Sequence, residues 1–288
     1  MAERTPLALD AGPYRLGVIG DPVAHSLSPA LHQPALNELG IAATYERWHT
    51  AASDIPERIR GLRAPDVLGA SVTVPHKIAV MPLLDEISAT ALRAGAVNTI
   101  VNRDGRLIGD NTDIYGFGVT VAEALAGERP KTALVLGAGG AARAVVLALE
   151  EAGIAEIVVA NRAIDRAAKL ARDLEPAPSR AVELTDAVLA EELPRAGILV
   201  NATSLGWHAG EMPIKAEWLD LLPDDAVVAD LTYRDTGLLL AAAECGLRTA
   251  DGLPMLVHQG ARAFTLWTGR AAPVETMLNA ARAARDSG

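Results

Sequence analysis

A glycine-rich turn in the middle of the chain constrains the fold more than any other feature. Apolar residues 133–136 run into Gly137-Ala138-Gly139-Gly140-Ala141-Ala142, which fits the pattern G-x-G-x-x-A, and an alanine-rich helical stretch follows as far as Gly153. These glycines let the backbone turn tightly and approach a pyrophosphate, whose negative charge meets the amide groups at the start of the helix. Because strand, glycines, helix and a second strand occur in this order, we predict a Rossmann unit in which Gly137, Ala138, Gly139, Gly140 and Ala141 bind a dinucleotide.

The end of the next predicted strand indicates which dinucleotide binds. Asn161 and Arg162 follow the glycines by about 20 residues, where an NAD-binding unit usually has an acidic residue for the ribose hydroxyls. A guanidinium suits a 2′-phosphate through charge-assisted bonds, and Arg166 lies one helical turn further on the same face. The alternative is that both arginines lie on a solvated helix face and are balanced by Asp165. We favour NADP over NAD as the cofactor.

Short apolar runs rich in Val and Ile alternate with helical patterns on both sides of the glycine turn. The first series predicts strands at 16–19 and 67–74, a helix at 29–39 that Gly40 ends, a helix after Pro75 and a hairpin turn at Asp104-Gly105. The second series predicts strands at 132–136, 157–160, 198–200 and 226–231, with helices from about Gly252 onward. We therefore predict an α/β protein of two domains, each with a parallel sheet, and a boundary near Asp113. On this pattern alone, the helical tail can pack on either domain.

Composition and charge exclude several classes of protein. The formal net charge of −10 argues against a partner bound through a positive field, such as nucleic acid or an anionic membrane. No apolar run approaches the length of about 18 residues that a membrane span needs, and residues 1–12 lack the apolar region of a secretory signal. The single Cys245, interpreted as a core residue, agrees with a cytoplasmic protein. The six histidines show no metal-ligand spacing and are interpreted as polar surface or cleft-lining residues.

Four polar stretches fall at predicted strand ends or loops, where open α/β sheets bind their ligands. They are Ser26-Leu27-Ser28-Pro29, Thr73-Val74-Pro75-His76-Lys77, Gly95-Ala96-Val97-Asn98-Thr99 and Asn111-Thr112-Asp113. Ser26 and Ser28 precede a helix, so their hydroxyls and the first-turn amides can hold a carboxylate. The alternative is that Ser28 is simply an N-cap, and from this segment alone the two interpretations are equal.

Lys77 is one of only four lysines in a chain that carries 22 arginines. Lysine can lose its proton near neutral pH when it is partly desolvated, whereas arginine cannot, so a proton-transfer role requires lysine. Asp113 can orient that ammonium group and hold a substrate hydroxyl. On composition alone, an isolated lysine is more often a surface residue.

Taken together, these motifs resemble the shikimate dehydrogenase family over nearly the whole chain. The motifs include Val72-Thr73-Val74-Pro75-His76-Lys77, Asp110-Asn111-Thr112-Asp113, Asn201-Ala202-Thr203-Ser204 and Asp251-Gly252 through Gln259, besides those quoted above. The resemblance implies reversible, NADP-dependent reduction of 3-dehydroshikimate to shikimate in aromatic amino-acid and chorismate biosynthesis, without a metal, by a monomer or homodimer. It also implies that the C-terminal helices return to the first domain. The expected domains are then 1–112 with 252–288 for the substrate and a Rossmann domain over 113–251.

The resemblance also assigns roles to individual residues. Lys77 and Asp113 match the catalytic pair, with Lys77 supplying a proton while hydride passes from the nicotinamide to the C3 carbonyl. The positions that match substrate contacts are Ser26, Ser28, Thr73, Asn98, Asp113, Tyr233 and Gln259. The positions assigned to the cofactor are Gly137, Ala138, Gly139, Gly140, Ala141, Asn161, Arg162, Arg166, Thr203 and Gly252.

Some positions depart from the usual family pattern, and two other functions stay open. Ser71 replaces a common Asn, Ala163 a Thr, Trp207 a Met, Arg234-Asp235 an Asn-Pro pair and Pro254 a Gly. The nearest alternative is a quinate or aminoshikimate dehydrogenase, because it shares nearly every motif. A non-catalytic NADP-sensing protein is a second alternative, although a sensor needs neither Lys77 nor Asp113 as a proton-transfer pair.

Overall fold

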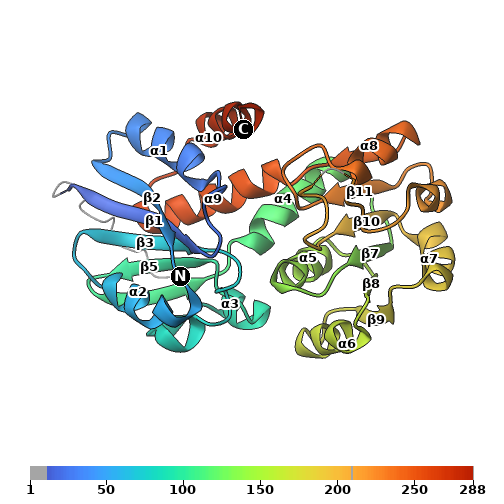
Figure 1. The fold of residues 1–288 in the computed structure, drawn as a ribbon, viewed down its shortest axis with the longest axis horizontal. Coiled ribbons are helices and arrows are strands. Elements are labelled where there is room, and N and C mark those ends of the chain that lie inside the picture. The colour runs from blue at the N-terminus through green and yellow to red at the C-terminus, as the bar shows by residue number, and fades with distance from the viewer. Residues whose placement is uncertain (1–11, 209, 288) are drawn as a thin grey trace. The chain divides into compact units, whose positions relative to one another are not determined.

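The computed structural model describes residues 12–208 and 210–287, and the chain divides into two compact units (Figure 1). The first unit contains the chain up to Thr112 together with Val257 onward, and the second contains Asp113–Leu256. The second division falls inside helix α9 (Leu253–Thr268), whereas the boundary expected from the sequence lies after Asp251.

The first unit is built on a six-stranded sheet in the order β2-β1-β3-β5-β6-β4. Its strands are β1 (Tyr14–Gly20), β2 (Ala43–His49), β3 (Val67–Val72), β4 (Glu86–Ile87), β5 (Thr99–Arg103) and β6 (Arg106–Asp110). β1 pairs in parallel with β2 and β3, but β5 is antiparallel to both β3 and β6, so the expected parallel sheet is in fact mixed. The predicted hairpin is confirmed, because β5 and β6 join at Asp104 and Gly105, whose φ angles of 52° and 86° suit a two-residue turn.

The first and the last of the described helices both belong to the first unit. They are α1 (Ser28–Glu38), α2 (Ile55–Gly61), α3 (Ala89–Ala94), most of α9, and α10 (Val274–Asp286), with 3-10 turns at Ala52–Asp54 and Met81–Leu83. α1 and α10 lie side by side (Figure 1). Gly40, with φ of 63°, follows the end of α1 as predicted. The helix predicted after Pro75 is wrong, because residues 74–80 form turns and Pro82 lacks the amide proton that a continuing helix needs.

The second unit is built on a six-stranded parallel sheet in the order β12-β11-β10-β7-β8-β9. Its strands are β7 (Thr132–Leu136), β8 (Glu156–Asn161), β9 (Ser179–Glu183), β10 (Ile198–Asn201), β11 (Val227–Asp230) and β12 (Arg248–Ala250). Its helices are α4 (Asp113–Leu125), α5 (Gly140–Glu151), α6 (Ile164–Asp173), α7 (Asp186–Glu192) and α8 (Gly237–Glu244), with 3-10 turns at Leu193–Arg195 and Ala216–Leu221. The chain builds one half of the sheet from β7 through β8 to β9 and the other half from β10 through β11 to β12, so the strand order reverses between β7 and β10. Ligands are therefore expected at the carboxyl ends of these two central strands.

Burial corrects two interpretations of single residues. His32 and His76 are each only 1% exposed, so they are core residues and not surface or cleft-lining ones. His76 is held there because its Nε2 donates to the carbonyl oxygen of Thr50, at 2.7 Å. Cys245 is exposed and not a core residue, because it follows the last turn of α8, beyond that helix's buried face. Trp267 is fully buried and is a packing residue of the core.

Two kinds of feature are absent from the part of the chain that the structure describes. None of its helices is both long enough and apolar enough to span a bilayer. Its His, Cys, Asp and Glu side chains form no cluster of three or more that could bind a metal ion.

Candidate functional site

The glycine turn of the second unit connects β7 to α5, and its glycines serve two different purposes. Gly137 has φ of 104°, and a Cβ there would lie 3.0 Å from the carbonyl oxygen of Ala202, so conformation and crowding both require glycine. A Cβ on Gly139 or Gly140 would meet no described atom within 4 Å. α5 begins at Gly140 without a side-chain cap or an acidic residue in its first turn. The backbone amide groups in the first turn of α5 therefore suit a phosphate, which binds favourably at a helix N-terminus.

The end of β8 carries the residues expected to select the dinucleotide. The side-chain amide of Asn161 donates to the carbonyl oxygen of Ala163 at 2.9 Å, which fixes the turn into α6. Arg162 and Arg166 are both exposed on this turn and on the first turn of α6. No ion pair in the described part of the chain joins Asp165 to either arginine, so the alternative of a balanced helix face loses its expected contact.

A hollow of about 310 Å³ lies beside Arg162. Apolar side chains form most of its walls, and Thr185, Asp186 and Lys215 add polar groups beside Arg162. The Nζ of Lys215 lies 3.4 Å from Asp186 Oδ2 and 3.6 Å from Glu217 Oε1, so its charge is already paired. Among the described residues that line this hollow, Arg162 is therefore the cation that has no acidic partner and can bind an anionic ligand. The site fits a phosphorylated dinucleotide better than one with free ribose hydroxyls.

Two buried polar residues fix the loops that follow β10 and β11. Asp230, only 1% exposed, accepts hydrogen bonds at 2.9 Å from the side chains of Asn201 and Thr236 and from the amide of Thr232. The Oδ1 of Asn201 accepts in turn from the amide and hydroxyl of Thr203, at 3.1 and 2.7 Å. One carboxylate therefore holds the loop that carries Thr203 and the loop that carries Tyr233.

We expect Asp230→Asn to lower the free energy of unfolding by about 1–3 kcal/mol, the usual cost of an unsatisfied buried polar group. The amide nitrogen of asparagine would face at least one of the three donors that the carboxylate now accepts from. Urea denaturation measures the change, with Asp224→Asn as the control, because Asp224 is exposed in the same unit. Equal stability of the two variants would contradict this role for Asp230.

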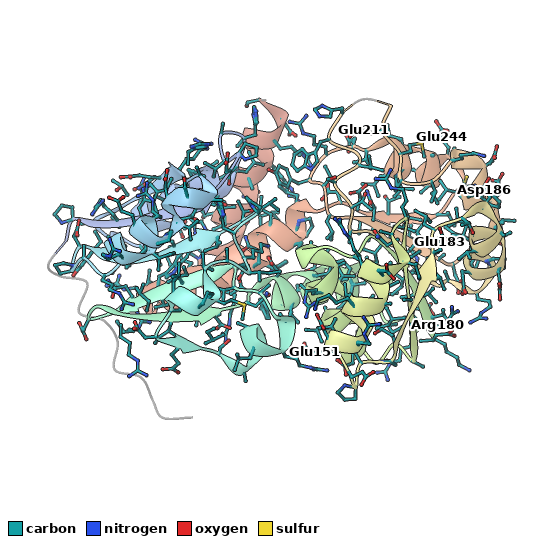
Figure 2. All side chains as sticks on the ribbon, turned by 60° about the horizontal axis from the view of Figure 1, so that its bottom comes forward. Glu151, Arg180, Glu183, Asp186, Glu211 and Glu244 are labelled. Carbon is teal, nitrogen blue, oxygen red and sulfur yellow. The ribbon has the colours of Figure 1, made fainter. Side chains whose placement is uncertain are left out.

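Tyr233 lies among residues that depart from the family pattern. Its ring is packed edge-on against Trp207, with centroids 5.0 Å apart at 85°, and the guanidinium of Arg234 lies 5.5 Å from the centre of the Trp207 ring. The Trp207 loop is closed by Glu211, labelled in Figure 2, whose Oε2 accepts from the amides of Gly206 and His208 at 3.1 and 3.2 Å. These hydrogen bonds hold the pKa of Glu211 below its usual value.

Gly252 is brought to the same loops by a close backbone approach. A Cβ on it would lie 2.1 Å from the carbonyl oxygen of Leu231, and its amide donates to the carbonyl oxygen of Thr232 at 3.1 Å. Any larger residue would therefore displace the loop that carries Tyr233. The predicted residues Thr203, Tyr233 and Gly252 are thus linked through the loops that Asp230 holds.

In the first unit, four predicted or neighbouring polar residues form one buried network. Asn98 Nδ2 donates to Thr112 Oγ1 at 2.9 Å and to Gln259 Oε1 at 3.3 Å. Asn98 Oδ1 accepts from the amide of Thr112 at 2.7 Å and from the hydroxyl of Thr99 at 3.0 Å. Residues far apart in the sequence, from the start of β5, the end of β6 and α9, therefore converge. The Thr112 amide also fixes the backbone immediately before Asp113, which is itself only 5% exposed.

Ser26 and Ser28 lie at the start of α1, but Ser28 is not the N-cap. Leu27 has that position, and Ser28 is the first helical residue, so the N-cap alternative is wrong. The hydroxyl of Ser26 donates to that of Ser28 at 3.1 Å and accepts from the Ser28 amide at 3.3 Å. The two hydroxyls therefore lie together at a helix start, where a carboxylate binds favourably.

Thr73 and Lys77 lie in the turns that follow β3. The amide of Thr73 bonds to Ile19 and its carbonyl accepts from the amide of His76, while Val97 donates its amide to the carbonyl oxygen of Lys77 at 2.8 Å. The side chain of His76 is buried and anchors the turn in the core, whereas the neighbouring Lys77 is only half-buried. The amine of Lys77 is therefore partly solvated. Lys77 belongs to the first unit, and Asp113 is the first residue of the second.

Comparison with known protein families matches three segments of the chain. Residues 18–100 match the shikimate dehydrogenase substrate binding domain, residues 120–216 match shikimate / quinate 5-dehydrogenase, and residues 252–282 match the shikimate 5′-dehydrogenase C-terminal domain. A relative from Symbiobacterium thermophilum, named shikimate dehydrogenase (NADP(+)), is 48% identical over 281 residues, or 95% of each chain. The chain belongs to the shikimate dehydrogenase family. It is therefore an oxidoreductase.

Solved structures of shikimate dehydrogenase family members have the same fold. A shikimate 5-dehydrogenase from Thermus thermophilus, in complex with NADP(H) and shikimate, is 44% identical with a TM-score of 0.82, covering 94% of this chain and 100% of that one. A quinate dehydrogenase from Corynebacterium glutamicum, in complex with NAD, is 33% identical with a TM-score of 0.84, covering 93% and 98%. The α/β fold and the family predicted from the sequence are confirmed.

Sequence reasoning missed several residues that shape the site of this shikimate dehydrogenase family member. The sequence does contain a signal for Asp230, because it is an acidic residue at the end of an apolar strand. Polar residues at strand ends are the ones that indicate a site in an open α/β sheet. The contact between Trp207 and Arg234 joins two departures from the family pattern that lie apart in the sequence, so spacing gives no sign of it. Tyr45, whose hydroxyl donates to that of Ser71 at 2.8 Å, gives no local signal in the sequence.

Proposed function

We propose that this chain catalyses the reversible, NADP-dependent reduction of 3-dehydroshikimate to shikimate. The observation that carries this proposal is the 48% identity, over 95% of both chains, to a relative named shikimate dehydrogenase (NADP(+)). The exposed Arg162 at the end of β8 supports the choice of NADP over NAD, because its charge matches a 2′-phosphate.

We assign the proton transfer to Lys77 and Asp113. NADPH, when bound, supplies hydride to the C3 carbonyl of the substrate. Lys77 donates a proton to the oxygen that becomes the shikimate hydroxyl, and in the reverse direction it takes that proton back. Asp113 is the second member of the pair and holds a substrate hydroxyl. Its position at the first residue of α4, fixed through Thr112, supports this role, since a helix N-terminus favours a carboxylate.

We assign recognition of the substrate to two groups of residues. Ser26 and Ser28 hold the carboxylate, which their adjacent hydroxyls and the start of α1 support. Thr73, Asn98 and Gln259 contact ring hydroxyls, and the bond between Asn98 and Gln259 supports their joint action. Tyr233 completes the set from the loop after β11.

We assign the cofactor to the carboxyl ends of β7, β8 and β10. Gly137, Ala138, Gly139, Gly140 and Ala141 hold the pyrophosphate, and Asn161, Arg162 and Arg166 hold the adenosine 2′-phosphate. Thr203 and Gly252 contact the rest of the dinucleotide. The open space above Gly139 and Gly140 and the unpaired charge of Arg162 among the described residues support these assignments.

We expect shikimate with NADP+ to give the highest kcat/KM in a panel of shikimate, quinate and aminoshikimate against NADP+ and NAD+. The reason is the combination of the full hydroxyl-binding set with Arg162. Formation of reduced nicotinamide, followed by its absorbance, measures every pair. The family also includes a quinate dehydrogenase solved with NAD, so faster turnover of quinate with NAD+ would replace our proposal with that activity.

We further propose a cytoplasmic enzyme that acts on small molecules as a monomer or homodimer and binds neither nucleic acid nor membranes. The single cysteine and the net charge of −10 support this location and these partners. The sedimentation coefficient, measured at the protein concentrations used in activity assays, distinguishes a monomer from a homodimer.

A further inference from the structure

Four hydroxyl groups follow one another at the start of α1, and we call them the hydroxyl series. Ser26 Oγ lies 3.1 Å from Ser28 Oγ, and Tyr45 Oη lies 2.8 Å from Ser71 Oγ. Burial raises the pKa of Tyr45, and the hydroxyls of Ser71 and Ser28 oppose that rise, which places Ser28 beside the phenol. The four hydroxyls come from the loop before α1, from α1 itself, from β2 and from β3. Ser28, Tyr45 and Ser71 are each less than 9% exposed, so the inner part of the series is shielded from solvent.

The ring of Tyr45 is fixed by packing that does not involve its hydroxyl. It stacks on His32, with centroids 4.4 Å apart at 15°, and lies 6.0 Å from the ring of Trp267. Burial lowers the pKa of His32 to about 3, so this neighbour stays uncharged near neutral pH. Burial also raises the pKa of Tyr45, which therefore remains a protonated phenol and a hydrogen-bond donor. The hydroxyl is thus available for a separate function.

Each hydroxyl in the series has one proton, which limits what it can donate. As the structure stands, Ser26 donates to Ser28, and Tyr45 donates to Ser71. If Ser26 and Ser28 both turn their protons toward a carboxylate, Ser28 Oγ loses the proton of Ser26 as a hydrogen-bond donor. Tyr45 is then the buried neighbour that can replace it, and Ser71 can donate to Tyr45 in turn. A bond donated into a hydroxyl oxygen strengthens the bond which that hydroxyl donates, because hydrogen bonds in series polarise one another.

We infer that Tyr45 is a positioning residue whose hydroxyl donates to Ser28 when a substrate carboxylate binds, with Ser71 supplying the next proton in the series. This inference rests on the proposed function, in which Ser28 holds the carboxylate. It also gives a role to Ser71, which stands where the family usually has asparagine, because a hydroxyl can reverse the direction of its bond by rotation alone.

The test is Tyr45→Phe, which removes the hydroxyl and keeps the stacked ring. We expect the KM for shikimate to rise by about 3- to 10-fold, the effect of one neutral hydrogen bond, while kcat and the KM for NADP+ change by less than about twofold. Ser71→Ala should raise the KM for shikimate in the same direction and to a smaller extent. Tyr14→Phe on β1 is the control and should leave all three constants unchanged.

Two further measurements separate positioning from general destabilisation. In a Ser28→Ala background, Tyr45→Phe should cause no additional rise in KM, because the hydroxyl through which it acts is gone. Methyl shikimate, an ester without the negative charge, should bind to the wild-type and Tyr45→Phe enzymes with similar KM. Additive effects of the two substitutions, or an unchanged KM for shikimate in Tyr45→Phe, would overturn the inference while leaving the proposed function intact. Absence of shikimate turnover by the wild-type chain would overturn both.

Discussion

Lys77→Ala is expected to lower kcat for shikimate oxidation by about 10²- to 10⁴-fold, the range that general acid-base groups contribute. The side chain is half-buried in the turns after β3, and its backbone is fixed by the bond from Val97, so the amine has a defined origin and partial access to solvent. Binding of NADP+ should stay nearly unchanged, because Lys77 belongs to the first unit and the glycine turn to the second. Steady-state kinetics gives the first quantity and fluorescence titration of the cofactor gives the second.

Two controls make the result specific to proton transfer at Lys77. Lys77→Arg keeps a positive charge but cannot lose a proton near neutral pH, so it should be almost as impaired as Lys77→Ala. Lys131→Ala removes an exposed lysine before β7 and should keep wild-type kcat. Full activity in Lys77→Ala would show that another group moves the proton.

The inner strands of both sheets could be predicted from the sequence, and the edge strands could not. The predicted apolar runs correspond to β1, β3, β7, β8, β10 and β11, and the hairpin corresponds to β5 and β6. The missed strands are β2, β4, β9 and β12, which are the four sheet edges. Edge strands are partly solvated, so their sequences carry charges: β2 reads ATYERWH and β9 reads SRAVE. An apolar run is a reliable signal only where both faces of a strand are covered.

The same limit separates the site residues that local patterns indicate from those that they do not. The glycine turn is predictable because the strand, the turn and the helix start that bind phosphate are consecutive in the chain. Asp230 acts on Asn201, 29 residues away, and Tyr45 acts on Ser71, 26 residues away. Such pairings depend on which strands are neighbours in the sheet, and spacing in the sequence does not contain that information. The family resemblance supplied candidate contacts but not the residues that hold them in place.

Arg162→Ala is expected to raise the Kd for NADP+ by about 10- to 150-fold, with little change in the Kd for NAD+. One hydrogen bond to a charged group contributes about 1.5–3 kcal/mol, and each 1.36 kcal/mol corresponds to a tenfold change in affinity. Arg162 is the exposed guanidinium at the end of β8, beside a hollow whose other cation, Lys215, is already paired with Asp186 and Glu217. The selectivity arises because NAD+ lacks the phosphate that this guanidinium would bind.

Arg172→Ala provides the matched control, because Arg172 is an exposed arginine in the last turn of the same helix, α6. It removes the same charge from the unit, so a loss of affinity through the general field would be equal in both variants. We expect only Arg162→Ala to bring the affinities for the two cofactors together. Cofactor titrations at two salt concentrations extend the test, since a direct phosphate contact weakens as ionic strength rises. An equal loss for NADP+ and NAD+ in Arg162→Ala would move the 2′-phosphate to another part of the unit.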